Sequence, residues 1–149
     1  MELKFICETN IDAPRDKVVA LWSDPDNLKH WQEGFLGIEH LTGERGATGS
    51  TSRMRYLMGK NEMELHETIV KNDLPDEFIG EYVHEKMSNR LTTRFTDLGD
   101  GRTAYWSEVH YTELHGFMVQ MMARLFPGVF KKQVMKWILN FKKFVEVQE

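Results

Sequence analysis

The segment VFKKQVMKWILNFKKFVEV, residues 129–147, has the clearest helical pattern in the sequence. Its apolar residues recur at spacings of three and four and form a stripe about 100° wide, whereas lysines cover much of the remaining surface. At about 1.5 Å per residue, a helix of this length spans roughly 28 Å, which is enough to cross a whole β-sheet. The segment therefore predicts a long amphipathic helix that packs on a sheet. The stripe contains Phe130, Val134, Trp137, Ile138, Phe141 and Val145.

A second apolar segment, residues 117–126, comes just before this helix and is separated from it by Pro127-Gly128. Proline lacks a backbone N–H and glycine is conformationally permissive, so the pair predicts a break between two helices. The two segments do not suit a membrane span, because six basic residues interrupt the stretch 117–145.

Residues 35–113 have a different pattern, in which short segments rich in β-branched and aromatic residues alternate with Gly, Asn, Asp and Pro. Asp100-Gly101 predicts a tight hairpin in which Gly101 has a positive φ. No helical pattern separates these segments, so we expect an antiparallel meander. The strands are expected near residues 35–42, 50–59, 62–71, 77–86, 88–97 and 103–113.

The N-terminal residues predict one more strand and two short helices. Residues 3–11 alternate between apolar and polar side chains, and Asp12-Ala13-Pro14 then ends the strand and begins a helix. A second short helix follows Asp26 and carries residues 28–31. The expected fold is therefore α+β, with a curved, seven-stranded antiparallel sheet wrapped around the long C-terminal helix.

The composition excludes several classes of protein. The chain has 149 residues, 41% of them hydrophobic, with 19 basic and 23 acidic side chains and a net charge of −4, which argues against a nucleic-acid partner. A single cysteine, Cys7, excludes a disulfide framework, and residues 1–10 lack the apolar core of a secretory signal. We therefore expect one cytoplasmic domain, residues 1–149, that is a monomer or a weak homodimer.

Several short motifs are spread along the whole chain. They are Ala13-Pro14, Val18, Leu21-Trp22, Asp24-Pro25 and Trp31 near the start, Gly101 and Thr103 at the last hairpin, and Phe141-Lys142 with Val145-Glu146 in the final helix. Together these motifs resemble the START-like (SRPBCC, Bet v 1-like) superfamily, which includes polyketide cyclases/dehydrases and lipid-transport proteins. The resemblance implies a helix-grip fold with a hydrophobic cavity between the sheet and the long helix. It implies no particular reaction, because the superfamily shares no universal catalytic residue.

Large, adaptable side chains are the candidates for lining this cavity. The chain has nine Met, nine Phe, four Trp and four Tyr, which suit either a ligand cavity or an ordinary core rich in aromatic residues. We expect Met121, Met122 and Leu125 at the mouth of the cavity and Trp31 at the end near the small helices. The full set of candidates is Trp31, Phe35, Met54, Tyr56, Tyr82, Phe95, Tyr105, Val109, Phe117, Met121, Met122, Leu125, Phe130 and Val134.

Few residues suggest catalysis or metal binding. Glu67, Glu108 and Tyr105 lie within predicted strands, and a carboxyl buried in the cavity could act as a general base. Strand alternation alone allows each of them to face water instead. His66, His84 and His110 could share one face of the sheet, but no compact metal-ligand motif is present. We therefore expect neither a metal nor a cofactor.

Three functions remain open on these grounds. The first, which we favour, is binding or transport of a small hydrophobic ligand such as a lipid, an isoprenoid or a polyketide-like molecule. The second is a cyclase, aromatase or dehydratase that uses a buried Glu or Tyr to move protons. The third is a protein-interaction module. A buried Glu that faces a Tyr or His would favour the enzyme, whereas a filled interior with a large exposed apolar patch would favour the interaction module.

Overall fold

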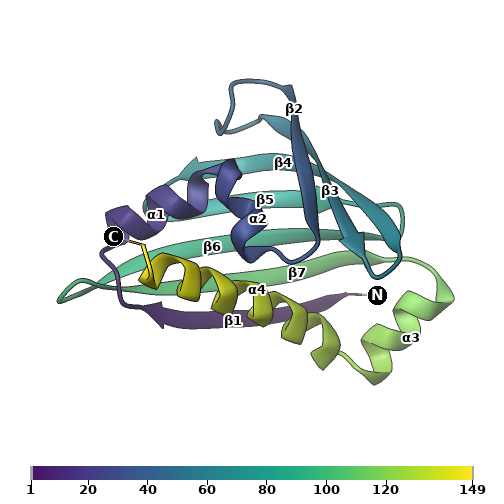
Figure 1. Ribbon diagram of the computed structural model, residues 1–149. Coiled ribbons are helices and arrows are strands. Elements are labelled where there is room, and N and C mark those ends of the chain that lie inside the picture. The colour runs from purple at the N-terminus through teal and green to yellow at the C-terminus, as the bar shows by residue number, and fades with distance from the viewer. Residues whose placement is uncertain (1, 149) are drawn as a thin grey trace.

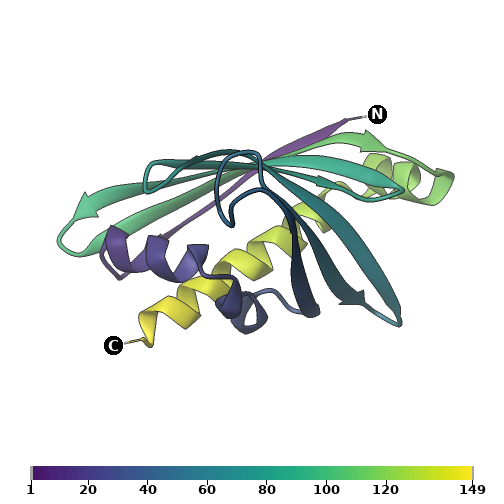
Figure 2. The ribbon, with the colours of Figure 1, turned by 90° about the horizontal axis from the view of Figure 1, so that it is seen from above.

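One antiparallel sheet of seven strands forms the frame of the molecule, which the computed structural model describes over residues 2–148 (Figure 1). Three helices and a single turn of 3-10 helix lie on its concave side, and a further helix projects at one end (Figures 1 and 2). The elements are β1 (Leu3–Ile11), α1 (Arg15–Ser23), η1 (Pro25–Asn27), α2 (Leu28–Trp31), β2 (Phe35–Thr42), β3 (Thr51–Met58), β4 (Asn61–Asp73), β5 (Glu77–Val83), β6 (Met87–Gly99), β7 (Arg102–Leu114), α3 (Phe117–Leu125) and α4 (Gly128–Glu146).

The strand order is β1-β7-β6-β5-β4-β3-β2, and every neighbouring pair is antiparallel. Strands β2 to β7 form the expected meander, and β1 returns to pair with the last strand, with Phe5 opposite Val109. This arrangement, with two short helices after β1 and a long C-terminal helix, confirms the predicted α+β fold. No helix within residues 2–148 is both long enough and apolar enough to cross a bilayer.

Several strand boundaries differ from the sequence-based expectation. Strand β5 ends at Val83 rather than near residue 86, because the backbone N–H of His84 bonds to the carbonyl of Met87 and closes a turn there. Strand β6 instead continues to Gly99, since backbone pairing with β7 extends beyond the part of the strand that packs on the core. Hydrogen bonding between neighbouring backbones, which side-chain patterns do not report, decides both ends.

The β6–β7 hairpin has the turn that Asp100-Gly101 predicted. Gly101 has a φ of 72° and Asp100 a φ of 53°, so both central residues adopt the left-handed conformation typical of tight hairpins. This turn brings β6 and β7 together along almost their whole length.

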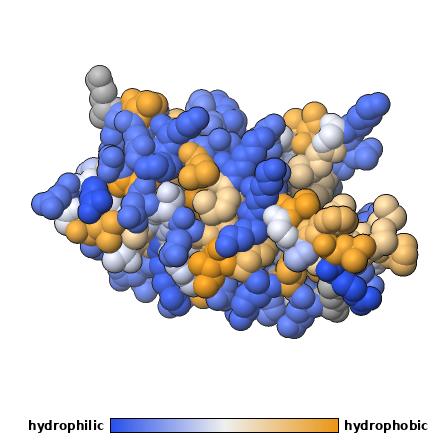
Figure 3. All heavy atoms as spheres, turned by 90° about the horizontal axis from the view of Figure 1, so that it is seen from below, coloured by the Kyte–Doolittle hydropathy of each residue, from blue (hydrophilic) through white to orange (hydrophobic). Residues whose placement is uncertain are grey.

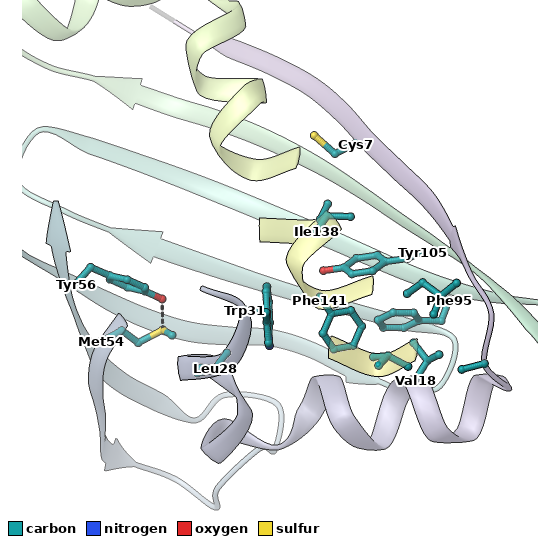
Figure 4. Close-up of a cluster of buried hydrophobic side chains, with 13 residues drawn as sticks. Cys7, Val18, Leu28, Trp31, Met54, Tyr56, Phe95, Tyr105, Ile138 and Phe141 are labelled. Carbon is teal, nitrogen blue, oxygen red and sulfur yellow. Dashed lines mark hydrogen bonds between the residues drawn. The ribbon is translucent and has the colours of Figure 1, made fainter. Parts of the chain in front are cut away.

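Helix α4 crosses the concave face and forms the centre of the core (Figures 2 and 4). Its residues Ile138, Phe141 and Val145 are buried, as the stripe predicted. Trp137, which the stripe also predicted to be buried, is only half-buried. Its ring stacks on that of Tyr56 at a centroid distance of 5.5 Å. The long helix therefore packs mainly against the β1 side of the sheet and covers the β3 side only partly.

Helix α1 closes one end of the concave face. The Trp22 ring packs edge-on against Phe78 and Phe95, with centroid distances of 5.1 and 5.4 Å. Its indole N–H donates to the Tyr105 hydroxyl at 2.9 Å, which satisfies two buried polar groups at once. The Thr103 hydroxyl likewise donates to the Ala13 carbonyl at 2.8 Å, so the start of α1 is anchored to β7.

Candidate ligand-binding site

The concave face has a closed half and an open half. The closed half, under α1 and the C-terminal part of α4, is a fully buried core that includes Phe95, Tyr105 and Phe141 (Figure 4). In the open half, over β4 to β7 and the first turns of α4, several apolar side chains are only half-buried. We call this second set the open patch; its members are Met63, Leu65, Tyr82, Leu91, Tyr111, Phe130 and Val134.

Glu67 brings a carboxyl group to the same face as the open patch. Its neighbours across the strands are Ser52 on β3 and Tyr82 on β5, and the Tyr82 hydroxyl donates to Glu67 Oε2 at 2.8 Å. No ion pair to Glu67 is present within residues 2–148. Burial raises the pKa of Glu67, and the hydrogen bond from Tyr82 opposes that rise only in part. Glu67 therefore binds a proton more readily than an exposed glutamate does.

Gly80 leaves room for the Tyr82 ring over β5. A Cβ atom at Gly80 would lie 2.8 Å from the Tyr82 hydroxyl oxygen, closer than non-bonded atoms approach. Only glycine leaves room for the ring in this position. Burial and the nearby Glu67 raise the pKa of Tyr82 well above its usual value, so its hydroxyl stays protonated and acts as a donor.

Tyr56 and Trp137 extend the site from β3 to α4. The Tyr56 hydroxyl donates to Gln32 Oε1 at 2.7 Å, and burial raises the pKa of this phenol. Phe35 packs edge-on against the Tyr56 ring at 5.7 Å. The rings of Tyr56, Trp137 and Phe35 thus form an aromatic wall held by the loop after α2.

Two buried indole N–H groups have no hydrogen-bond acceptor. The Nε1 atoms of Trp31 and Trp137 are buried and unpaired within residues 2–148. A buried donor without a partner costs about 1–3 kcal/mol, so such groups are uncommon unless something else satisfies them. Trp31 lies within the buried core, whereas the Trp137 ring stacks on Tyr56 at the aromatic wall.

The remaining predicted lining residues lie in two different surroundings. Met54, Phe95, Tyr105 and Val109 belong to the closed core rather than to the open patch. The burial of Tyr105 raises the pKa of its phenol, and its hydroxyl accepts from Trp22. The candidates from α3 point outward instead and are exposed; they are Phe117, Met121, Met122 and Leu125.

Glu108 is excluded as a catalytic residue of the concave face. It alternates with the inward-facing Ser107 and Val109, lies on the convex face, and forms an ion pair with Lys4 at 3.9 Å. The strand histidines also stay apart, and residues 2–148 contain no cluster of three potential metal ligands.

Two open hollows lie on the convex face, with volumes of about 350 and 360 Å³. Charged and polar groups line much of both. Glu81 and Arg90, which form an ion pair, border the first, and Glu8 and Asn10 border the second. The second is lined mostly by polar groups, and the first is an open hollow bordered by an ion pair, so neither is the enclosed apolar pocket that is typical of a site for a hydrophobic ligand.

Sequence analysis missed three parts of the site. Gln32 follows a short helix and has no pattern that would link it to a tyrosine far along the chain. Trp137 belongs to the apolar stripe and was assigned to the core. Gly80 interrupts a strand pattern, and an isolated glycine in a strand does signal close approach of another group, so this residue could have been found.

We expect Glu67→Gln to change how stability depends on pH. Because the native state raises the pKa of Glu67 above its ordinary 4.5, the native wild type binds the proton more tightly than the unfolded chain. Its stability relative to Glu67→Gln should therefore fall as the pH rises above about 4.5, until the native carboxyl is fully ionised. At neutral pH we expect Glu67→Gln to be more stable by about 1 kcal/mol. Urea unfolding between pH 4 and 8 measures this difference, and a difference that is constant with pH would contradict the assignment.

Comparison with known proteins agrees with this fold. The family model described as polyketide cyclase / dehydrase and lipid transport matches residues 4–136. The solved aromatase/cyclase ZhuI from Streptomyces sp. R1128 superposes with a TM-score of 0.81 and 9% identity, covering 98% of this chain and 94% of that one. No curated protein matches the sequence.

Two plant structures share the fold over the whole chain. Truncated norcoclaurine synthase from Thalictrum flavum has a TM-score of 0.73 and 15% identity, covering 100% of this chain and 96% of that one. Major latex-like protein 151 from Panax ginseng has a TM-score of 0.73 and 18% identity, covering 99% of each chain. Identities this low carry the fold alone. Because the family model covers most of the sequence, the chain belongs to the polyketide cyclase/dehydrase and lipid-transport family.

Proposed function

We propose that the open patch binds a small hydrophobic molecule that carries one polar, hydrogen-bonding group. The observation that carries this proposal is the Glu67 carboxyl, which lies on the same face as the open patch and has, within residues 2–148, a single hydrogen bond, from Tyr82. A carboxyl in such a place costs stability, and functional sites are where such costs are commonly found. The family's association with lipids and polyketides supports the same class of ligand.

The chemistry of the site suggests what the ligand offers. The apolar side chains favour rings or acyl chains, and burial of roughly 300 Å² of ligand surface contributes about 7 kcal/mol before the costs of association. Glu67 has capacity to accept a further hydrogen bond from a hydroxyl or N–H group. The unpaired Nε1 atom of Trp137 can donate to an oxygen of a molecule that reaches it. The affinity for the ligand therefore comes mainly from the apolar surface that it buries, and these few polar groups orient the ligand in the site.

Naphthol and naphthalene provide a matched pair of test ligands, because they differ only by a hydroxyl group. We would measure how each displaces the neutral fluorescent probe N-phenylnaphthylamine from the wild-type protein. Naphthol should displace the probe at about tenfold lower concentration than naphthalene, since a hydrogen bond to a charged acceptor contributes about 1.5–3 kcal/mol. Glu67→Leu should bring the two concentrations close together.

Glu108→Leu is the matched control, because it removes a carboxyl from the convex face of the same sheet. It should leave the preference for naphthol unchanged. Circular dichroism would check that each variant keeps its fold. If the wild type shows no saturable displacement, or if Glu67→Leu keeps the full preference for naphthol, the proposed site is wrong.

Acid–base catalysis is the second candidate function, and the raised pKa of Glu67 favours it. An ionised Glu67 could remove a proton from a carbon next to a carbonyl group of a bound ketone, and the protonated acid could return it. In this role Tyr82 holds the carboxyl in position through its 2.8 Å hydrogen bond. Two of the structural neighbours are named for enzymes, an aromatase/cyclase and norcoclaurine synthase.

Hydrogen exchange at a hydrophobic ketone tests this second candidate. Nuclear magnetic resonance would follow exchange of the α-protons of tetralone in D₂O, with and without the protein. If Glu67 catalyses the reaction, the α-protons should exchange faster with the wild-type protein than without protein. The catalysed rate should increase as the pH rises, because more of Glu67 is then ionised. In Glu67→Gln the rate should fall to that measured without protein. Exchange at equal rates with the wild type and Glu67→Gln would exclude catalysis by Glu67 and leave binding alone.

A further inference from the structure

Helix α3 is an amphipathic helix with its apolar side turned outward. Ala123, on the side that faces the protein, is buried, and Gln120 on that side donates to the Leu114 carbonyl at 2.8 Å. The opposite side is apolar and exposed: the exposed fraction is 75% for Phe117, 70% for Met118 and 61% for Leu125. A surface helix normally buries its apolar stripe, so this face lacks its partner.

Helix α3 lies at one end of the molecule, where a large binding partner can reach its exposed apolar face. The helix projects beyond the sheet at the end of the molecule opposite the C-terminus (Figures 1 and 2). Figure 3 shows hydrophobic side chains gathered at that end. The loop that follows α3 continues the apolar surface, since Phe126 and Val129 are 60% and 52% exposed.

Three exposed basic side chains, Arg124, Lys131 and Lys132, flank this apolar surface. The stretch 114–145 contains six basic residues and no acidic one, although the whole chain has a net charge of −4. Arg124 lies beside Phe117 on the helical wheel, and Lys131 and Lys132 begin the next helix. All three are exposed, and none forms an ion pair within the described residues 2–148. The partner of this surface is therefore expected to be negatively charged as well as apolar.

An anionic lipid bilayer combines these two properties. Helices with an apolar face and flanking Lys or Arg lie in the interface of such bilayers, with the apolar side chains among the acyl chains. The basic residues then meet the negative lipid headgroups, each contributing to the binding. A projecting convex helix suits insertion into lipid better than it suits a flat protein surface.

We propose that α3 and the following loop dock the protein on an anionic membrane surface. Phe117, Met118 and Leu125 enter the interface, and Arg124, Lys131 and Lys132 contact the lipid headgroups. The docking is peripheral and independent of any ligand bound to the open patch.

Co-sedimentation with lipid vesicles tests the proposal without any added ligand, so its outcome does not depend on the proposed function. The protein should bind vesicles of phosphatidylcholine and phosphatidylserine in equal parts, and bind more weakly to phosphatidylcholine alone. Met118→Glu/Leu125→Glu should lower binding at least about tenfold, because charged groups replace two inserted apolar side chains. Lys131→Gln/Lys132→Gln should lower binding to the anionic vesicles by about 30-fold and change binding to neutral vesicles little.

Leu98→Glu/Val147→Glu is the matched control, because it adds the same charge at exposed apolar positions (40% and 76% exposed) at the other end of the molecule. It should bind vesicles nearly as well as the wild type. Loss of binding in this control equal to that in the α3 variant would overturn the proposal, as would no binding by the wild type. Light scattering after gel filtration distinguishes the alternative partner, a second copy of the chain. A wild-type dimer that becomes a monomer in Met118→Glu/Leu125→Glu, without vesicle binding, would make α3 a dimer interface and overturn lipid docking.

Discussion

Phe141→Ala should destabilise the protein by about 3–5 kcal/mol, as large truncations in a packed core do. The Phe141 side chain is fully buried at the point where α4, α2 and β7 meet (Figure 4). Its ring packs edge-on against Trp31 and Tyr105, with centroid distances of 5.3 and 5.6 Å. Alanine would leave a cavity between these rings. A loss of about 3–5 kcal/mol is a large fraction of the free energy of unfolding of a typical domain. Urea unfolding measures it.

Leu139→Ala is the control for this effect, because Leu139 lies two residues away in the same helix but is 45% exposed. It should cost less than about 1 kcal/mol. Equal losses for the two variants would show that the packing of α4 on the sheet differs from that described here.

Gly34→Ala should be the second most damaging change, with a loss of about 2–4 kcal/mol. Gly34 has a φ of +90°, and a Cβ atom there would lie 2.4 Å from the carbonyl oxygen of Leu57. Its own carbonyl accepts from the Leu57 N–H at 2.7 Å, so the close approach is part of how β2 joins β3. Relief of the overlap requires a backbone shift that would also displace the neighbouring Phe35 from Tyr56.

Gly49→Ala separates conformational strain from steric overlap. Gly49 has the same φ of +90°, but a Cβ atom there would meet nothing within 4 Å. We expect a loss of about 1 kcal/mol from strain alone. Thermal unfolding of both variants gives the comparison, and a loss for Gly34→Ala no greater than that for Gly49→Ala would contradict the close contact with Leu57.

Glu67 illustrates why stability and function can oppose each other in this fold. Its carboxyl lies on the same face as the open patch and costs stability there; Tyr82 holds it by a hydrogen bond, and Gly80 leaves room for the Tyr82 ring. We expect Glu67→Gln to be more stable at neutral pH, whereas removal of the carboxyl in Glu67→Leu should weaken selection for ligands with a hydroxyl group. A gain in stability with a loss of function is the usual result at a functional site.

The sequence by itself determined the element order and much of the core. The apolar stripe of residues 129–147 predicted a long helix on a sheet, and Asp100-Gly101 predicted the tight hairpin; the structure confirms both. These features could be predicted because the periodicity of side chains and the conformation of a tight turn are local properties of the chain. The element order and the motifs that resemble the START-like superfamily then predicted the overall fold.

Only the tertiary structure decided which candidates face the concave side. Glu67 and Glu108 both lie within strands, and alternation assigns each to one of two faces without saying which face is concave. The pairing of Glu67 with Tyr82 and of Lys4 with Glu108 depends on strand register and on the side of the sheet that α4 covers. The outward apolar face of α3 was likewise invisible in the sequence, because an apolar stripe is the same whether or not the fold provides a surface to cover it. Burial is a property of residues that meet across the whole chain, so the pattern of one segment cannot determine it.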